Sequence, residues 1–158
     1  MDEEKNYHGK FNVYGVGCLV KYLDKILLVK RKNYPWQEKW WTGVMGLPKE
    51  GENARATAIR EVKEEVGLEV YGLIELRKEP YKTFAQDFGS SYSCKIFIAH
   101  SYNDRIKLNK EELIDAKFFS QEELDKIELA PITKVILKDF GINKIRLTEE
   151  DLSYLIEE

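Results

Sequence analysis

Three glutamates with helical spacing dominate one stretch of the chain, residues 46 to 68, which reads GLPKEGENARATAIREVKEEVGL. Glu61, Glu64 and Glu65 stand at positions i, i+3 and i+4, so in a helix their carboxylates would converge on one flank. Like charges at these spacings oppose helix formation by roughly 0.2–0.5 kcal/mol per pair unless something neutralises them. A divalent cation would do so, and hard oxygen ligands on one rigid face favour magnesium (Mg²⁺) or manganese (Mn²⁺). The stretch therefore predicts a metal site.

A solvated acidic face on a surface helix is the alternative, because the chain has 28 acidic residues and clusters of them arise easily. Two earlier residues favour the catalytic interpretation. Gly46 and Glu52 precede the helix, so a loop with a fourth carboxylate leads into the cluster. Arg60 is always charged and cannot bind a metal, but it can hold a neighbouring carboxylate in position or form a helix ion pair with Glu64.

The same residues also fit a longer pattern, G-x5-E-x7-R-E-U-x-E-E-x-G-U with U aliphatic, without a gap or a substitution. Here the chain resembles the MutT-like Nudix hydrolases. The resemblance implies hydrolysis of a pyrophosphate bond in a nucleoside diphosphate linked to another group, a nucleotide or dinucleotide-type substrate. It implies metal contacts from the glutamate side chains and the Gly46 backbone, and support from Glu52. It also implies a general base outside residues 46–68, for which Glu112 is the candidate and Glu111 the next; an exposed loop charge is the other role open to Glu112.

Recognition of the substrate is expected from aromatic and basic residues around this stretch. Trp36 and Trp40 have polar, loop-like neighbours and are candidates for stacking on a base, whereas Trp41 is a core candidate. Arg31, next to Lys30 at the end of a predicted strand, could meet phosphates or simply be a solvated strand end. A second aromatic connection adds two more candidates, Tyr81 and Phe84.

The glutamates require a helix that packs on a core. Asn53 can cap its start and Gly67 suits a left-handed stop after it. Its apolar positions are spaced to form one stripe: Ala58, Ile59, Val62 and Val66.

The other expected elements place this helix among strands. Strands are predicted at 11–22 and 25–31, with a turn near Asp24, and at 69–77, 92–102 and 115–119; helices are predicted at 121–127 and 131–140. Strands on both sides of a helix indicate an α/β (α+β) fold with a mixed sheet between helices. The resemblance implies the Nudix-type α/β/α sandwich.

Length supports one domain over residues 1–158, with a helical extension at about 144–158. Thr148 and Asp151 resemble a capping box that opens a last helix, 148–157. Leu152, Leu155 and Ile156 of that helix must be buried on their own domain or across a homodimer, which we expect.

Composition and charge indicate which partners the protein binds and where in the cell it is expected. A net charge of −3 argues against a stable nucleic-acid partner, so the expected partner is a small-molecule nucleotide. The first residues lack the pattern of a secretory signal, and no apolar run approaches the ~20 residues that span a bilayer, so we expect a cytoplasmic protein without a membrane partner. Cys18 and Cys94 are expected as reduced core thiols.

Two other functions stay open. An isopentenyl-diphosphate-isomerase-like enzyme resembles this fold and needs a reactive cysteine, whereas Cys94 looks like a strand residue. A non-catalytic Nudix-like nucleotide-binding module would usually have lost the glutamates that this chain keeps.

Overall fold

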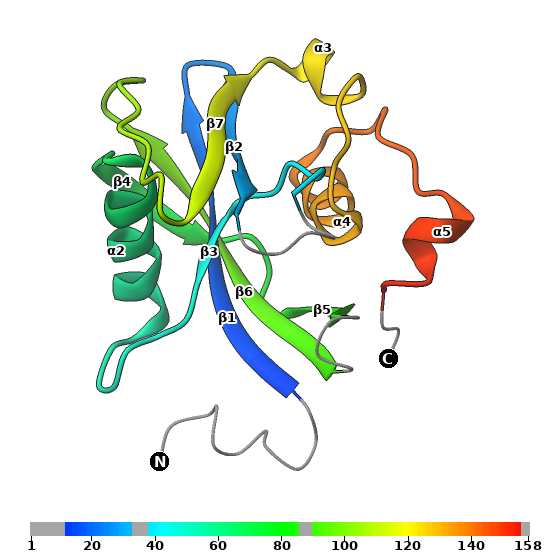
Figure 1. Ribbon diagram of the computed structural model, residues 1–158, viewed down its shortest axis with the longest axis horizontal. Helices are drawn as coiled ribbons and strands as arrows, with labels where there is room; N and C mark the ends of the chain where they lie inside the picture. The colour runs from blue at the N-terminus through cyan, green and yellow to red at the C-terminus, as the bar shows by residue number, and fades with distance from the viewer. Residues whose placement is uncertain (1–11, 33–37, 86–89, 156–158) are drawn as a thin grey trace.

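A computed structural model describes residues 12–32, 38–85 and 90–155 of the chain (Figure 1). Its strands form one sheet in the order β4-β6-β1-β2-β7, with β3 paired to β1 and β5 paired to β6. The strands are β1 (Asn12–Tyr22), β2 (Lys25–Arg31), β3 (Val44–Gly46), β4 (Val70–Glu75), β5 (Tyr81–Ala85), β6 (Ser90–Ser101) and β7 (Leu113–Phe119). The helices are α2 (Ala54–Val66), α3 (Gln121–Leu124), α4 (Pro131–Phe140) and α5 (Glu149–Leu152).

The sheet is mixed, as predicted. Strand β1 pairs with β6 in parallel, while every other pair of these strands is antiparallel. Strands β1 and β2 form a tight hairpin in which Tyr22 pairs with Lys25, so the turn expected near Asp24 is present. Its first turn residue, Leu23, adopts a positive φ of 55°.

Each face of the sheet buries its own apolar cluster, because side chains alternate along the strands. On β2, Leu27 and Val29 belong to the cluster beneath α2, whereas Ile26 and Leu28 belong to the cluster that includes α4. Figure 1 shows α2 on one side of the sheet and α4 and α5 on the other. The predicted α/β/α sandwich is thereby confirmed.

Helix α2 starts and stops where the sequence predicts. The Asn53 side chain accepts a hydrogen bond from the Ala56 backbone N–H at 2.8 Å, and Gly67 ends the helix with a φ of 70°. One expectation is wrong: Ile59 is 41% exposed and does not belong to the buried stripe. Ala58, Val62 and Val66 form that stripe.

Two strands were not expected. Strand β3 has three residues, too few to show an alternating pattern, and β5 lies in the connection that the sequence analysis assigned to substrate-binding aromatics. Helix α3 is also shorter than expected, since it ends at Leu124. Helix α4 has the predicted bounds, and Cys18 and Cys94 are free and buried, as expected.

The predicted capping box of the last helix is present, with Thr148 and Asp151 exchanging hydrogen bonds across the first turn. The helix itself is shorter than 148–157, because α5 ends at Leu152. Leu152 is 51% exposed, and Ile156 lies outside the described residues. The homodimer stays a prediction. In the described part of the chain, no helix has the length and apolar character required to cross a membrane.

Candidate active site

The loop between β3 and α2 is fixed around the carboxylate of Glu52. One oxygen of Glu52 accepts hydrogen bonds from the Lys49 backbone N–H at 3.0 Å and from the Thr57 hydroxyl at 2.7 Å. Thr57 is fully buried in the first turns of α2. Glu52 therefore ties the loop to the helix, and its support of a catalytic site stays a prediction.

Arg60 connects the acidic residues of the loop and the helix. Its Nε and Nη2 atoms each donate to Glu52 at 2.8 Å. Its Nη1 donates to Glu61 at 2.6 Å and to Glu64 at 3.1 Å, and Nη2 also donates to the Leu47 carbonyl at 2.9 Å. The hydrogen bonds that Glu52 accepts, first of all those from Arg60 and then those from Lys49 and Thr57, lower its pKa to about 2. Both roles predicted for Arg60 are therefore present together.

Gly46 ends β3 directly beside the Glu61 side chain. A Cβ atom on Gly46 would overlap the carboxylate carbon of Glu61, so any larger residue would push the two apart. The backbone of Gly46 is paired with Val16 of β1, which anchors this close approach to the centre of the sheet. Glycine is needed at position 46 because a Cβ atom would collide with the Glu61 side chain, and not because the backbone requires a positive φ there.

Glu65 is the most unusual group in the site because it is fully buried and acidic. Its Oε1 lies 3.3 Å from the Arg31 guanidinium, while its Oε2 has no hydrogen-bond partner among the described residues. Burial raises the pKa of Glu65 above its ordinary value; Arg31 opposes that shift, and the nearby carboxylates of Glu61 and Glu112 add to it. A hydrogen bond with Glu61 also contributes to the raised pKa of Glu65, so this buried pair is relieved either by a proton that the two carboxyl groups share or by a cation.

The acidic side chains of the helix pair with two arginines. Among the described residues, no three acidic, His or Cys side chains are arranged closely enough to hold a metal ion. Arg60 holds Glu61 and Glu64, and Arg31 holds Glu65. Two arginines thus contribute positive charge beside the acidic side chains, while one oxygen of Glu65 has no hydrogen-bond partner among the described residues.

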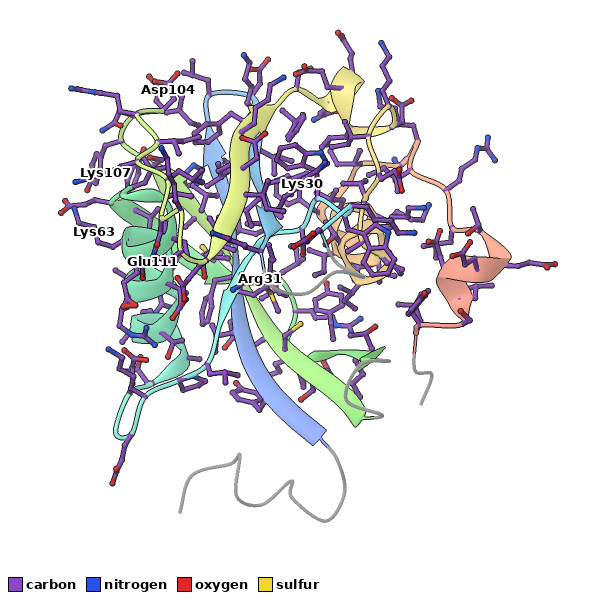
Figure 2. The ribbon with its side chains drawn as sticks, in the orientation of Figure 1. Lys30, Arg31, Lys63, Asp104, Lys107 and Glu111 are labelled. Carbon is purple, nitrogen blue, oxygen red and sulfur yellow. The ribbon has the colours of Figure 1, made fainter. Side chains whose placement is uncertain are left out.

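The loop before β7 brings Glu112 to this site. The backbone N–H groups of Lys107 and Asn109 donate to the carbonyls of Val66 and Glu65 at 2.8 and 2.9 Å, which fastens the loop to the end of α2. The Asn109 amide donates to the exposed Glu112 carboxylate at 3.2 Å. In the view of Figure 2, the neighbouring Glu111 lies between Arg31 and α2. Both candidate bases are therefore on a loop that contacts the glutamate helix.

Arg31 lies deeper than its predicted role at the phosphates suggested. Its Nη1 donates to Glu65 and, at 3.4 Å, to the Met45 carbonyl. Substrate binding by Arg31 stays a prediction, and it would require the guanidinium to exchange a carboxylate partner for a phosphate.

The aromatic candidates separate into different groups. Trp40 meets Tyr154 edge to face, with ring centroids 5.3 Å apart, and Lys39 Nζ lies 5.5 Å from its ring centre. Tyr81 is 1% exposed and donates its hydroxyl to Asp139 at 2.7 Å, so the structure corrects its assignment: it is a core residue of β5. Trp36 and the side chain of Phe84 lie outside the described residues.

Three residues that shape the site were not identified from the sequence. Thr57 and Asn109 position Glu52 and Glu112, and Tyr154 meets Trp40. The signal for Asn109 was its place two residues before Glu111, where its side chain accepts the Glu111 N–H at 3.1 Å in a local turn. Tyr154 gave no such signal, because its partner is 114 residues away (154 − 40).

Known proteins resemble this chain in sequence and in fold. Residues 12–140 match the family model described as NUDIX domain. An uncharacterized Nudix hydrolase of Listeria monocytogenes is 28% identical over 127 residues, which are 78% of this chain and 72% of that protein. Two solved structures have a similar fold. The crystal structure of a MutT NUDIX hydrolase from Burkholderia pseudomallei has a TM-score of 0.70 at 20% identity, covering 81% of this chain and 97% of that one. The NUDIX domain of Shewanella oneidensis NrtR, complexed with ADP ribose, has a TM-score of 0.71 at 16% identity, covering 91% and 99%.

The family model spans most of the chain, and it includes the whole of residues 46–68 with all their glutamates. The chain therefore belongs to the Nudix hydrolase family, whose members are pyrophosphohydrolases.

Proposed function

We propose that this protein is a divalent-metal-dependent pyrophosphohydrolase that acts on a nucleoside diphosphate linked to a further group. The observation that carries the proposal is the pair of carboxylates on α2, Glu61 and Glu65. They lie close enough for Glu61 to raise the pKa of Glu65, and one oxygen of Glu65 is buried without a partner among the described residues. A cation bound between the two carboxylates would lower the raised pKa of Glu65 and give its unpartnered oxygen a partner.

The side chains present carry the kind of donor atom that magnesium and manganese prefer, although Arg60 and Arg31 pair with them in this arrangement. Glu61, Glu64 and Glu65 provide hard carboxylate oxygens from one helix, and the Gly46 backbone lies against Glu61. When bound, such an ion would neutralise charge on the diphosphate oxygens. Glu64 is the most accessible of the three, with 43% of its side chain exposed.

The protein's own groups would then prepare the attack of water. Arg60 keeps the acidic side chains in one orientation through its bonds to Glu52, Glu61 and Glu64. Glu112 is the proposed general base, which takes a proton from the attacking water. The oxygen of that water bonds to phosphorus while the bond from phosphorus to the bridging oxygen breaks. The leaving phosphate keeps the electron pair of the broken bond. The Asn109 amide holds the Glu112 carboxylate for this step.

The substrate class is proposed from the aromatic residue before β3. Trp40 offers a ring on the segment that leads directly to Gly46, and stacking on a base contributes roughly 1–3 kcal/mol. The structural neighbour that holds ADP ribose is an example of such a ligand on this fold. A phosphate-release screen over nucleotide sugars, dinucleoside polyphosphates, ADP-ribose, coenzyme A and nucleoside triphosphates would identify the substrate.

The proposal is tested by removing the metal and its ligands separately. Chelation should abolish hydrolysis, and added magnesium or manganese should restore it. Glu64→Gln and Glu65→Gln should each lower kcat by orders of magnitude while the circular dichroism spectrum stays that of the parent. Glu69→Gln is the matched control, since Glu69 follows the same helix and is largely exposed. Full activity of both ligand variants would refute the metal assignment.

The structure does not favour an isomerase-like function. Burial raises the pKa of the Cys94 thiol to about 12, so it is not a reactive thiolate of the kind that an isomerase would need. A non-catalytic binding module would bind the best nucleotide of the screen but release no phosphate from it, and the same assay detects this.

A further inference from the structure

Residues 148–155, which we call the C-terminal clasp, lie beyond the part of the chain that matches the family model. The clasp contacts α4, β5 and the segment before β3. Figure 1 shows it beside α4, on the opposite side of the sheet from the glutamate helix. A segment of eight residues that is fastened to three separate elements has a defined position on the domain.

The first attachment is an ion pair to α4. Asp151 Oδ2 lies 2.7 Å from Lys134 Nζ, and both side chains are mostly buried. The same oxygen accepts the Thr148 backbone N–H at 2.8 Å, which closes the first turn of α5. Burial opposes ionisation of Asp151, but the Lys134 ammonium and the Thr148 hydrogen bonds lower its pKa. The start of the clasp is therefore fixed against α4.

The second attachment is to β5. Leu155 forms an antiparallel bridge with Thr83, and the Thr83 hydroxyl donates to the Tyr154 carbonyl at 2.5 Å. Because its own carbonyl and the next residue are both bound to the edge of the sheet, Tyr154 has little freedom to shift along the surface.

The third attachment is the contact between the Tyr154 and Trp40 rings, with centroids 5.3 Å apart and planes at 89°. This is the edge-to-face arrangement that aromatic pairs prefer. The next residue, Trp41, is fixed independently: its backbone N–H donates to Glu128, its carbonyl accepts from Ala130, and its ring packs on Phe119. The backbone of Trp40 is thus fixed by its neighbour Trp41, and its ring is fixed by contact with Tyr154.

We infer that Tyr154 is a positioning residue for substrate recognition: it fixes the Trp40 ring in the orientation that stacks on the base. The inference rests on the proposed function, in which Trp40 is the stacking residue. Trp40 lies six positions before Gly46, so at most about 20 Å of backbone separates the two residues. A fixed Trp40 ring would affect binding of the base and leave the hydrolysis of the diphosphate unchanged. Loss of Tyr154 should therefore change KM and not kcat.

The test uses Tyr154→Ala, Tyr154→Leu and Tyr154→Phe in the full chain, with the best nucleotide of the screen and with a diphosphate compound that lacks a base. Losing the aromatic edge should raise KM for the nucleotide about 2- to 12-fold in the Ala and Leu variants, with kcat near that of the parent. Tyr154→Phe keeps the ring contact and should restore the parental KM. Hydrolysis of the compound without a base should be the same in all variants.

Leu152→Ala is the matched control, since it removes an exposed side chain from the same short helix. A parental KM for the nucleotide in Tyr154→Ala and Tyr154→Leu overturns the inference, and so does an equal effect on both compounds. Trp40→Ala separates the two proposals. If that variant binds the nucleotide normally, the stacking role itself is wrong; if it raises KM while the Tyr154 variants do not, only the positioning role is wrong.

Discussion

Arg60 and Glu52 form a two-point ion pair across the turn that opens α2, with Nε and Nη2 of the guanidinium each 2.8 Å from a different carboxylate oxygen. The third nitrogen of the same guanidinium reaches Glu61 and Glu64. One side chain therefore sets the relative positions of the loop carboxylate and two helix carboxylates. A lysine ammonium is a point charge and cannot make this planar set of contacts.

Arg60→Lys should lower kcat/KM by about 10- to 100-fold, because residues that orient metal ligands typically have effects of this size. The fold should persist, as the helix cap and buried stripe are untouched. Steady-state kinetics at several magnesium concentrations, together with circular dichroism, measure both effects. Lys63→Ala serves as control, since Lys63 is a largely exposed residue of the same helix. Parental kinetics in Arg60→Lys would contradict the role assigned to Arg60.

Glu52 should make stability depend on pH in the acid range. Hydrogen bonds from Arg60, and also from Lys49 and Thr57, lower its pKa from an ordinary 4.5 to about 2 in the folded protein. Since the folded pKa is the lower one, the stabilisation is complete above about pH 4.5 and is lost as the pH falls toward 2. Urea unfolding of the parent and Glu52→Gln should therefore show a difference in unfolding free energy at pH 6 that shrinks between pH 4.5 and 2. A difference that does not change with pH would count against this ion pair.

Gly46→Ala should disturb the site through contact alone. The added methyl group would overlap the Glu61 carboxylate, and because this is the end of a flexible side chain, we expect Glu61 to swing away from its present position. We expect weaker binding of manganese, measured by titration calorimetry, and a lower kcat. Gly43→Ala is the matched control, because the nearest atom to its Cβ would lie at an ordinary 3.5 Å. Equal manganese affinities for both variants would show that the close approach has no function.

Glu112→Gln should lower kcat by about 10²- to 10⁴-fold with little change in KM, because loss of a general base affects proton transfer and leaves binding intact. Glu111→Gln on the same loop gives the comparison. If Glu111→Gln shows the loss and Glu112→Gln does not, the base is Glu111.

The elements that local chemistry defines were predicted well. Asn53, Gly67 and the run from Pro131 to Phe140 set their own boundaries through caps and periodicity, and α2 and α4 begin and end where these signals place them. The error at Ile59 has a simple physical cause: α2 packs with a narrow stripe, and a residue at the margin of the apolar face was assigned to its centre.

What the sequence could not supply were partners far apart in the chain. Tyr81 was interpreted as a binding residue because its carboxylate partner, Asp139, lies in another element and no local pattern connects them. The ion pair between Arg31 and Glu65 was missed for the same reason. The glutamate pattern identified the candidate residues, but only the fold shows that Arg31 and Arg60 pair with them.

The parallel pairing of β1 with β6 has a consequence for how the molecule assembles. Asn12 lies opposite Ser91 and Lys21 opposite His100, so the first described strand finds its central neighbour about 79 residues later in the chain. Chains dominated by such distant pairings fold in milliseconds to seconds, whereas helical bundles need only microseconds to milliseconds. The glutamate helix is complete at residue 66, well before that neighbour exists. Two groups that surround Glu65, the backbone N–H of Asn109 and the carboxylate of Glu112, come later than β6, so the surroundings of Glu65 are complete only when the loop before β7 packs against α2.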